Sequence, residues 1–359
     1  MPTTHKKQRA FGYYYVLLTV LLLVTLVLSI RVGPVSIGFN KILAFIYDAC
    51  GYPQQGAFTH VEQQVFLQIR LPRVILCAFT GTALSVSGTL MQGLFRNPIV
   101  EPGLVGTSSG AALGAAFVFV MGKSLTGIHI DWLGPYLMPL FAFAGGLAAT
   151  LVVYRLSSIF GKTQVNTMIL AGIAINALAN GGTGFLSYIA RDPQARSITF
   201  WNLGTLSGAD WSAVVLVGCS TIAGILISLR YAKALNALML GEEEAGYLGI
   251  NTERMKWQII VLNSFMVAIA TSLVGVIGFV GLIVPHIMRM WRSSDNRFLI
   301  ISSALAGAIL LNVADMLART LVSPSEFPIG IVTALAGAPV FVYILIYQNR
   351  KQQRGGFYA

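Results

Sequence analysis

The chain has 359 residues, of which 55% are hydrophobic and 10% are charged, and its formal net charge is +11. A water-soluble core could not bury that much apolar surface, so the composition excludes a soluble globular protein and indicates an integral membrane protein. The positive charge is explained by basic residues beside membrane spans and their attraction to anionic lipid, so we expect no nucleic-acid partner.

The apolar runs are long and do not alternate as strands would, which predicts an all-α integral membrane protein with a single transmembrane domain over residues 1–359. The first four spans are expected at about 13–30, 73–95, 103–121 and 135–156. A basic tail with no small-residue cleavage site after it predicts an uncleaved first span and a cytoplasmic N-terminus. Residues 31–64 are more polar and should form an outside loop. Gly81, Ser85 and Gly88 have the spacing that lets membrane helices approach closely.

The fifth expected span, residues 165–189, is unusually polar because it carries Asn166, Asn176, Asn180 and several glycines. Such a helix should face the bundle interior or a water-filled path instead of lipid. Burial through glycine contacts is the competing explanation, but it accounts for the glycines better than for the asparagines.

The remaining spans complete a predicted bundle of ten helices. The sixth covers about 211–229, and the last two cover about 296–317 and 328–347. Residues 257–290 are too long for one crossing and short for two, so a discontinuous pair of helices is expected there. The residues predicted to break this stretch are Gly275, Gly278, Gly281 and Pro285. The basic C-terminal segment should be cytoplasmic, like the N-terminus.

A charged loop at about 232–253 separates the sixth span from the seventh. Glu242, Glu243 and Glu244 follow Gly241 and precede Gly249, which predicts a short helix with carboxylates at its N-terminal end and a glycine stop. Its other face would carry Leu240, Tyr247 and Leu248. Flanking basic residues place the loop in the cytoplasm, where it could present a docking element to a partner. A solvated connection between two spans is an equally good interpretation of the composition.

Two further groups of side chains could bind partners or solute on the outer side. Arg70, Arg73 and Arg319 are expected to form a basic patch for an acidic protein, with arginine snorkelling to headgroups as the alternative. Asp315 stands four residues before Arg319, the spacing of an intrahelical ion pair. Arg196, Phe200 and Trp201 would receive a flat, anionic, partly apolar solute, or belong to an interfacial aromatic belt.

We find no constellation of nucleophile, acid and base, so no catalytic residue is expected. Cys50, Cys77 and Cys219, like the four histidines, lack the spacing of a metal site, and we expect neither a metal nor a bound cofactor. Gly161-Lys162-Thr163 resembles the end of a phosphate-binding loop. It lacks the required glycine five residues earlier, where Leu156 stands.

With these residues in hand, the chain closely resembles the permease subunits of bacterial ABC importers for iron chelates, haem and vitamin B12, the FecCD type. The matching stretches run almost end to end, and as an ordered set they are specific. They include Arg70-Leu-Pro-Arg73, Asn97-Pro98 with Glu101-Pro102-Gly103, Leu240-Gly241-Glu242 with Leu248-Gly249, Gly278-Phe279-Val280-Gly281 with Pro285-His286, and Phe327-Pro328-Ile329-Gly330.

The resemblance implies a vitamin B12 permease-like (type II ABC importer) bundle that works as a homodimer in the bacterial inner membrane. It also implies two separate ABC ATPase subunits, which carry the ATP and Mg²⁺, and a periplasmic binding protein. Val165 is apolar where the B12 permease has a hydroxyl residue. The family roles fall on an ATPase coupling loop (Leu240, Gly241, Glu242, Glu243, Glu244, Leu248, Gly249), on binding-protein docking (Arg70, Arg73, Arg319) and on the cytoplasmic gate of the path (Asn97, Ile99, Val165, Asn166). The polarity of the fifth span adds Asn176 and Asn180 to the predicted path.

The stretch Gln194–Trp201 looks more like haem permeases, so the expected cargo is haem ahead of ferric siderophore, with cobalamin as the alternative. An ion-coupled secondary transporter without an ATPase is less consistent with the sequence. Such carriers hold an ionisable group at mid-membrane, whereas the acidic residues here lie near loops or span ends, with Asp315 as the closest exception. A structural or sensory membrane subunit, which would carry no solute, is a third interpretation.

Overall fold

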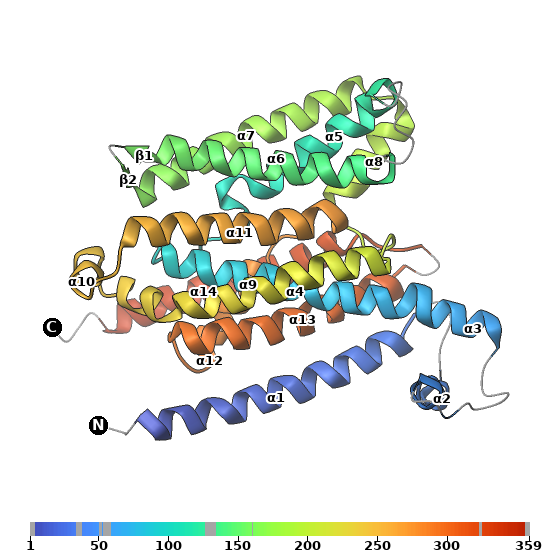
Figure 1. Ribbon diagram of the computed structural model, residues 1–359, viewed down its shortest axis with the longest axis horizontal. Coiled ribbons are helices and arrows are strands. Elements are labelled where there is room, and N and C mark those ends of the chain that lie inside the picture. The colour runs from blue at the N-terminus through green and yellow to red at the C-terminus, as the bar shows by residue number, and fades with distance from the viewer. Residues whose placement is uncertain are drawn as a thin grey trace.

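The computed structural model describes residues 4–33, 38–49, 52, 59–125, 134–159, 161–322 and 325–355, so Cys50 and His129 lie outside the described residues. The described chain is almost entirely helical (Figure 1). Its elements are α1 (Thr4–Arg31), α2 (Phe39–Ala49), α3 (His60–Gln64), a π-helical segment (Val65–Arg70), α4 (Leu71–Leu94), a 3₁₀ turn (Pro102–Val105), α5 (Thr107–Leu125), α6 (Gly134–Ser157), β1 (Ser158–Ile159), β2 (Lys162–Thr163), α7 (Val165–Ile189), α8 (Asp192–Asn202), α9 (Trp211–Leu238), α10 (Glu242–Tyr247), α11 (Thr252–Val274), α12 (Val280–Trp291), α13 (Asn296–Thr320) and α14 (Ile329–Gly355).

Seven described helices are long and apolar enough to cross a membrane, which makes the chain a multi-pass membrane protein. They include the continuous helix His60–Leu94, formed by α3, the π-helical segment and α4. Three shorter apolar helices accompany them, at Thr107–Gly122, Val280–Trp291 and Ile329–Ile344. The predicted fifth span coincides with α7, whereas the sixth extends well beyond its predicted end because α9 continues to Leu238.

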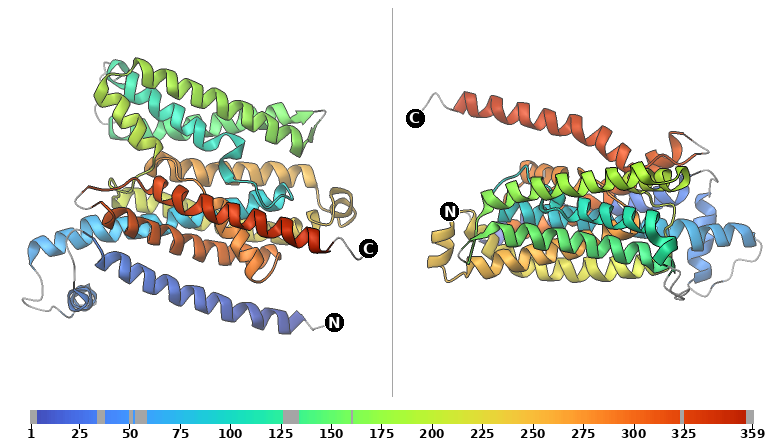
Figure 2. Two further views of the ribbon diagram at one scale, coloured as in Figure 1. Left: turned by 180° about the vertical axis from the view of Figure 1, so that it is seen from behind. Right: turned by 90° about the horizontal axis from the view of Figure 1, so that it is seen from above.

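Helix α4 lies at the centre of the bundle, with α9, α11, α12 and α13 around it (Figures 1 and 2). In the most apolar stretch of its span 78% of the residues are buried, against 22% for α1. The expected close approach is confirmed, since a Cβ added to Gly81 would lie 2.2 Å from the Gly307 carbonyl oxygen. A Cβ on Gly88 would lie 1.8 Å from the carbonyl oxygen of Gly281. Glycine therefore lets α13 and α12 pack directly on the backbone of α4.

The predicted discontinuous pair is α11 and α12, separated by residues 275–279. Gly275 ends α11 with a φ of 75°, and Phe279 adopts a φ of 68° before α12 begins. The break is shorter than predicted. Gly281 and Pro285 both lie inside α12, where Gly281 serves packing against α4 instead of interrupting the helix.

Helices α5, α6 and α7 form a layer on one side of the bundle, next to α11 (Figure 1). The antiparallel pair β1 and β2 joins α6 to α7. This pair lies at the same end of the molecule as α10, the beginning of α1 and the end of α14, whereas α8 lies at the opposite end (Figure 1). The bundle therefore has two distinct ends, and we call them the α10 end and the α8 end.

Candidate functional site

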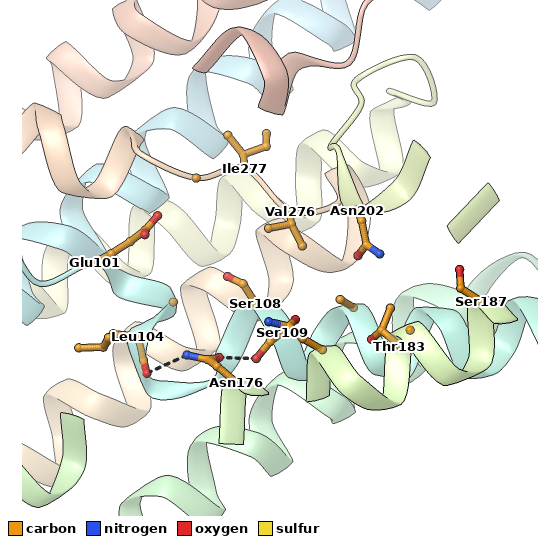
Figure 3. Close-up of a pocket in the computed structure, with 15 residues that line it drawn as sticks. Glu101, Leu104, Ser108, Ser109, Asn176, Thr183, Ser187, Asn202, Val276 and Ile277 are labelled. Carbon is orange, nitrogen blue, oxygen red and sulfur yellow. Dashed lines mark hydrogen bonds between the residues drawn. The ribbon is translucent and has the colours of Figure 1, made fainter. Parts of the chain in front are cut away.

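A cavity of about 630 Å³ lies between the layer of α5 and α7 and the break that separates α11 from α12. Its lining is partly apolar, and we call it the polar cavity after the polar side chains that also line it. Its polar lining is made of hydroxyls, amides and one carboxyl group, and it holds no basic side chain. In Figure 3 Glu101 lies at one end of this lining and Ser187 at the other. The polar residues that line the cavity are Glu101, Ser108, Ser109, Asn176, Asn180, Thr183, Ser187 and Asn202.

Two of the asparagines predicted on the path, Asn176 and Asn180, do line this cavity. Asn176 is held from both sides: its Nδ2 donates to the Leu104 carbonyl oxygen at 3.3 Å, and its Oδ1 accepts from the Ser109 hydroxyl. Figure 3 shows both contacts. Asn180, one turn further along α7, is exposed. The polar face of α7 is therefore turned partly into the cavity and partly out of the subunit.

Glu101 connects the cavity lining to the break in the α11–α12 pair. Its Oε1 accepts a hydrogen bond of 3.0 Å from the backbone N–H of Phe279, the residue with positive φ. Burial raises the pKa of the Glu101 carboxyl, and the bond from Phe279 opposes that shift. The carboxyl thus stabilises a backbone conformation that a non-glycine residue rarely adopts.

The four residues expected to narrow the path near the cytoplasm lie on two segments, the turn after α4 and the first turn of α7. Ile99 is 46% exposed, and its N–H donates to Asn97 Oδ1 at 3.0 Å, which fixes the turn. Asn166 is exposed, and Val165 is half-buried against an apolar cluster that includes Val100. The structure places both segments against one cluster, and their role as a gate stays a prediction.

The loop predicted to dock a partner folds as expected. Helix α10 begins after Gly241, whose φ is 153°, and the chain leaves it through Gly249, whose φ is 80°. The Ile250 N–H donates to the Ala245 carbonyl oxygen at 3.1 Å, the pattern of a glycine-terminated helix. Leu240, Tyr247 and Leu248 are 71%, 88% and 66% exposed. Large apolar side chains exposed together on a polar loop indicate a protein interface.

The three arginines expected to form an outer basic patch lie close together, but the structure buries them. Arg70, Arg73 and Arg319 are 5%, 7% and 4% exposed. Arg73 pairs with Asp315 at 2.9 Å and with Glu326 at 2.7 Å, and the predicted ion pair of Arg319 with Asp315 is present at 3.0 Å.

Arg70 and Arg319 also donate to backbone carbonyls at the end of α1, including Ile30 and Ser29. The expected exposed patch is therefore a buried network that joins α1, α4 and α13. Neighbouring carboxylates and unpaired carbonyls draw the guanidinium groups inward. A docking role for these arginines stays a prediction.

The solute contacts expected on α8 divide into exposed and buried side chains. Arg196 is exposed and Phe200 is 52% exposed. Trp201 is 7% exposed and packs against Ala111, Ala112 and Ala142. Trp201 is therefore largely covered by packing within the single subunit, and its role as a solute contact stays a prediction. Asn202, the next residue, lines the cavity.

Ser108, Ser109 and Asn202 were not predicted from the sequence as cavity residues. Glu101 was known only as part of a motif, and Lys256 is one of the basic residues that flank the charged loop. Glu101 could have been noticed because a carboxylate between two apolar runs needs a partner. Lys256 could have been noticed because it lies within α11 with a glutamate three residues earlier.

Comparison with known proteins places the chain among transport permeases. The family model described as the FecCD transport family matches residues 21–347. The hemin transport system permease protein HmuU of Yersinia pestis is 44% identical over 292 residues, covering 81% of this chain and 85% of the relative. The vitamin B12 import system permease protein BtuC of Citrobacter koseri is 35% identical and covers 88% of this chain and 94% of its own.

A solved structure described as an inward-facing conformation of an ABC transporter, assigned to the metal-chelate type, superposes with a TM-score of 0.80. It shares 31% sequence identity and covers 94% of this chain and 99% of that chain. The similarity in sequence and the similarity in fold therefore both extend over most of the chain. Because the family model spans residues 21–347 and these relatives match over most of their own length, the chain belongs to the FecCD transport family.

Proposed function

We propose that this chain is the transmembrane subunit of an ATP-driven importer for a metal chelate, with haem ahead of ferric siderophore as the cargo. One observation carries the proposal: a polar cavity lies among the membrane helices of a chain that is 44% identical to a hemin permease. Cobalamin is the alternative cargo, because the vitamin B12 permease is also similar over most of this chain.

A second copy of the chain would complete the path. Helix α7 carries the cavity asparagines and also exposes large apolar side chains, among them Leu178 at 71% and Phe185 at 63%. Lipid would be a poor neighbour for Asn180 on this face, because amides in hydrocarbon lack hydrogen-bond partners. A homodimer, packed so that the two α7 helices enclose a shared path, would cover both kinds of side chain.

The two ends of the bundle suit different partners. The exposed apolar side chains around α10 would dock a separate ATPase subunit, which binds and hydrolyses ATP with Mg²⁺, so this chain is a transport subunit and not itself an enzyme. The α8 end would face the periplasm and a substrate-binding protein. In this orientation both termini lie in the cytoplasm. The seven long and three shorter apolar helices, α12 among the shorter, would then make ten crossings of a bacterial inner membrane.

Uptake in proteoliposomes tests the proposal. The permease would be reconstituted with its ATPase subunits and binding protein, and haem, a ferric siderophore and cobalamin would be offered with ATP inside or with a proton gradient alone. We expect ATP-dependent uptake of haem. Uptake driven by the proton gradient without the ATPase would contradict the proposal, as would a membrane that carries none of the three chelates.

Replacement of one exposed residue checks the coupling surface. We expect Leu248→Asp to insert normally but to lose ATPase binding and uptake, because it places a charge in an apolar contact. Tyr13→Ala, on an exposed stretch of α1 (70% exposed), is the matched control and should transport normally. Full uptake by Leu248→Asp would show that α10 does not form the ATPase interface.

A further inference from the structure

Lys256, in the second turn of α11, is among the largest side chains that are almost fully buried in the described structure, with 1% of its surface exposed. Burying a lysine ammonium costs several kcal/mol unless it is paired and hydrogen-bonded. All three of its donors are used. Lys256 Nζ lies 2.9 Å from Glu242 Oε2, 2.9 Å from Glu253 Oε1 and 3.0 Å from the carbonyl oxygen of Thr163.

The three acceptors belong to three different segments that meet at the α10 end of the bundle. Glu242 is the first residue of α10, Glu253 lies in the first turn of α11, and Thr163 ends β2. Figure 1 shows α10 and the β1–β2 pair at this same end. Glu253 Oε2 also accepts from the Thr163 N–H at 2.7 Å, so both backbone groups of Thr163 are bound by this cluster.

Thr163 lies two residues before Val165, where α7 begins. Glu242 is also 4.0 Å from Arg96, which directly precedes Asn97. The cluster is therefore one contact away from each of the two segments predicted to narrow the cytoplasmic end of the path. Below it, Met255, Val100 and Met168 form one apolar cluster, against which Val165 and Ile250 pack. These segments cannot move independently without breaking ion pairs or opening a cavity.

We infer that Lys256 is a positioning residue that couples movement of α10 to the first turn of α7. When a partner bound to the exposed surface of α10 moves this helix, Glu242 is displaced with it. Lys256 passes the displacement to the backbone of Thr163, and Glu253 holds the same peptide from the other side. The inference deepens the proposed function and rests on it, because it assumes that α10 receives the ATPase.

The test uses the full complex in proteoliposomes and compares Lys256→Met with Arg254→Met, an exposed cation two residues away that serves as the matched control. Three quantities are measured: the ATP hydrolysis rate, the cargo transported per ATP, and the labelling of Val165→Cys by a thiol reagent with and without a non-hydrolysable ATP analogue. The labelling uses a background without Cys50, Cys77 and Cys219.

We expect Lys256→Met to hydrolyse ATP while the cargo transported per ATP falls by about tenfold or more, the range of a coupling free energy between two sites. Labelling at position 165 should no longer respond to nucleotide. The Arg254→Met control should behave like the unmodified complex.

If Lys256→Met does not fold, Glu253→Gln makes the same test, since it keeps an oxygen acceptor but removes the charge that orients Lys256. Its expected loss of transported cargo per ATP is smaller, but its labelling should also lose the nucleotide response. An unmodified complex that fails to take up cargo with ATP would refute the proposed function. A working complex in which these variants keep normal coupling and labelling would refute the role of Lys256 alone.

Discussion

Asp315 shows why single residues in this bundle should differ greatly in their effect. Its carboxylate is fully buried and contacts both Arg73 and Arg319, whereas Glu326, the other partner of Arg73, has 40% of its side chain exposed. Removing the charge of Asp315 would leave two buried guanidinium groups without their shared partner. Removing the charge of Glu326 would leave Arg73 with Asp315.

We therefore predict that Asp315→Asn destabilises the permease by about 3–5 kcal/mol, the usual cost of breaking a buried ion pair. Glu326→Gln is the matched amide control, and its cost should stay at about 0–1 kcal/mol, as for an exposed pair. The difference in stability between the two variants is measured by thermal unfolding in detergent, with size-exclusion chromatography used to monitor the folded fraction. Equal unfolding temperatures for the two variants would show that the network does not hold α1 and α13 together.

Glu101 is the subject of a second prediction at the residue scale. Its charge and its hydrogen bond to Phe279 can be removed separately by substitution. Gln keeps the length of the side chain, and its amide oxygen can still accept the hydrogen bond from Phe279. Leu leaves the Phe279 N–H without that acceptor, at a cost of about 1–3 kcal/mol.

We expect Glu101→Gln to unfold at nearly the same temperature as the unmodified chain and to keep most of its uptake activity. Glu101→Leu should unfold at a lower temperature and lose most of its uptake activity. If Gln and Leu were equally harmful, the charge of Glu101 would matter more than the hydrogen bond.

Between elements, close packing depends on glycine at particular positions. A Cβ on Gly88 would collide with the backbone of α12, whereas one on Gly12 in α1 would meet nothing within 4 Å. We predict that Gly88→Ala costs about 1–3 kcal/mol through overpacking. Gly12→Ala should be neutral or slightly stabilising, because Ala favours the helix. Unfolding temperatures of both variants test this, and a harmless Gly88→Ala would mean that α12 can move away from α4.

The sequence predicted the elements whose signals are local. The bounds of α7, the short helix between Gly241 and Gly249, and the break after Gly275 follow from hydrophobic length, glycine and charge placement. These features depend on residues within about one or two turns of each other.

The sequence did not predict which charged side chains would be buried. Arg73 meets its partners Asp315 and Glu326 from more than 240 residues away in the chain, and Lys256 reaches Thr163 across 93 residues. Periodicity places a residue on a helix but does not show which distant carboxylate faces it. The arginines near span ends therefore gave the same pattern as exposed, snorkelling arginines.

At the scale of the whole molecule, polar side chains of the cavity lie on a helix that lipid would surround in a single subunit. Asn180 lines the cavity and is also exposed at the surface of the single subunit. If α7 faced lipid, this amide would be dehydrated and unpaired. If a second copy covers α7, Asn180 borders a shared path that water can enter.

Cysteine labelling distinguishes these arrangements. In a background without the native cysteines, Asn180→Cys would be compared with Leu151→Cys on α6, which is 44% exposed and does not line the cavity. A membrane-impermeant maleimide reacts with the thiolate, which forms in water and not in hydrocarbon. We expect Asn180→Cys to be labelled in proteoliposomes, with a rate that changes when ATP is bound, and Leu151→Cys to be protected in every condition. Protection of both positions would place α7 against lipid and would remove the shared path, whereas labelling of both would mean that α6 also faces water.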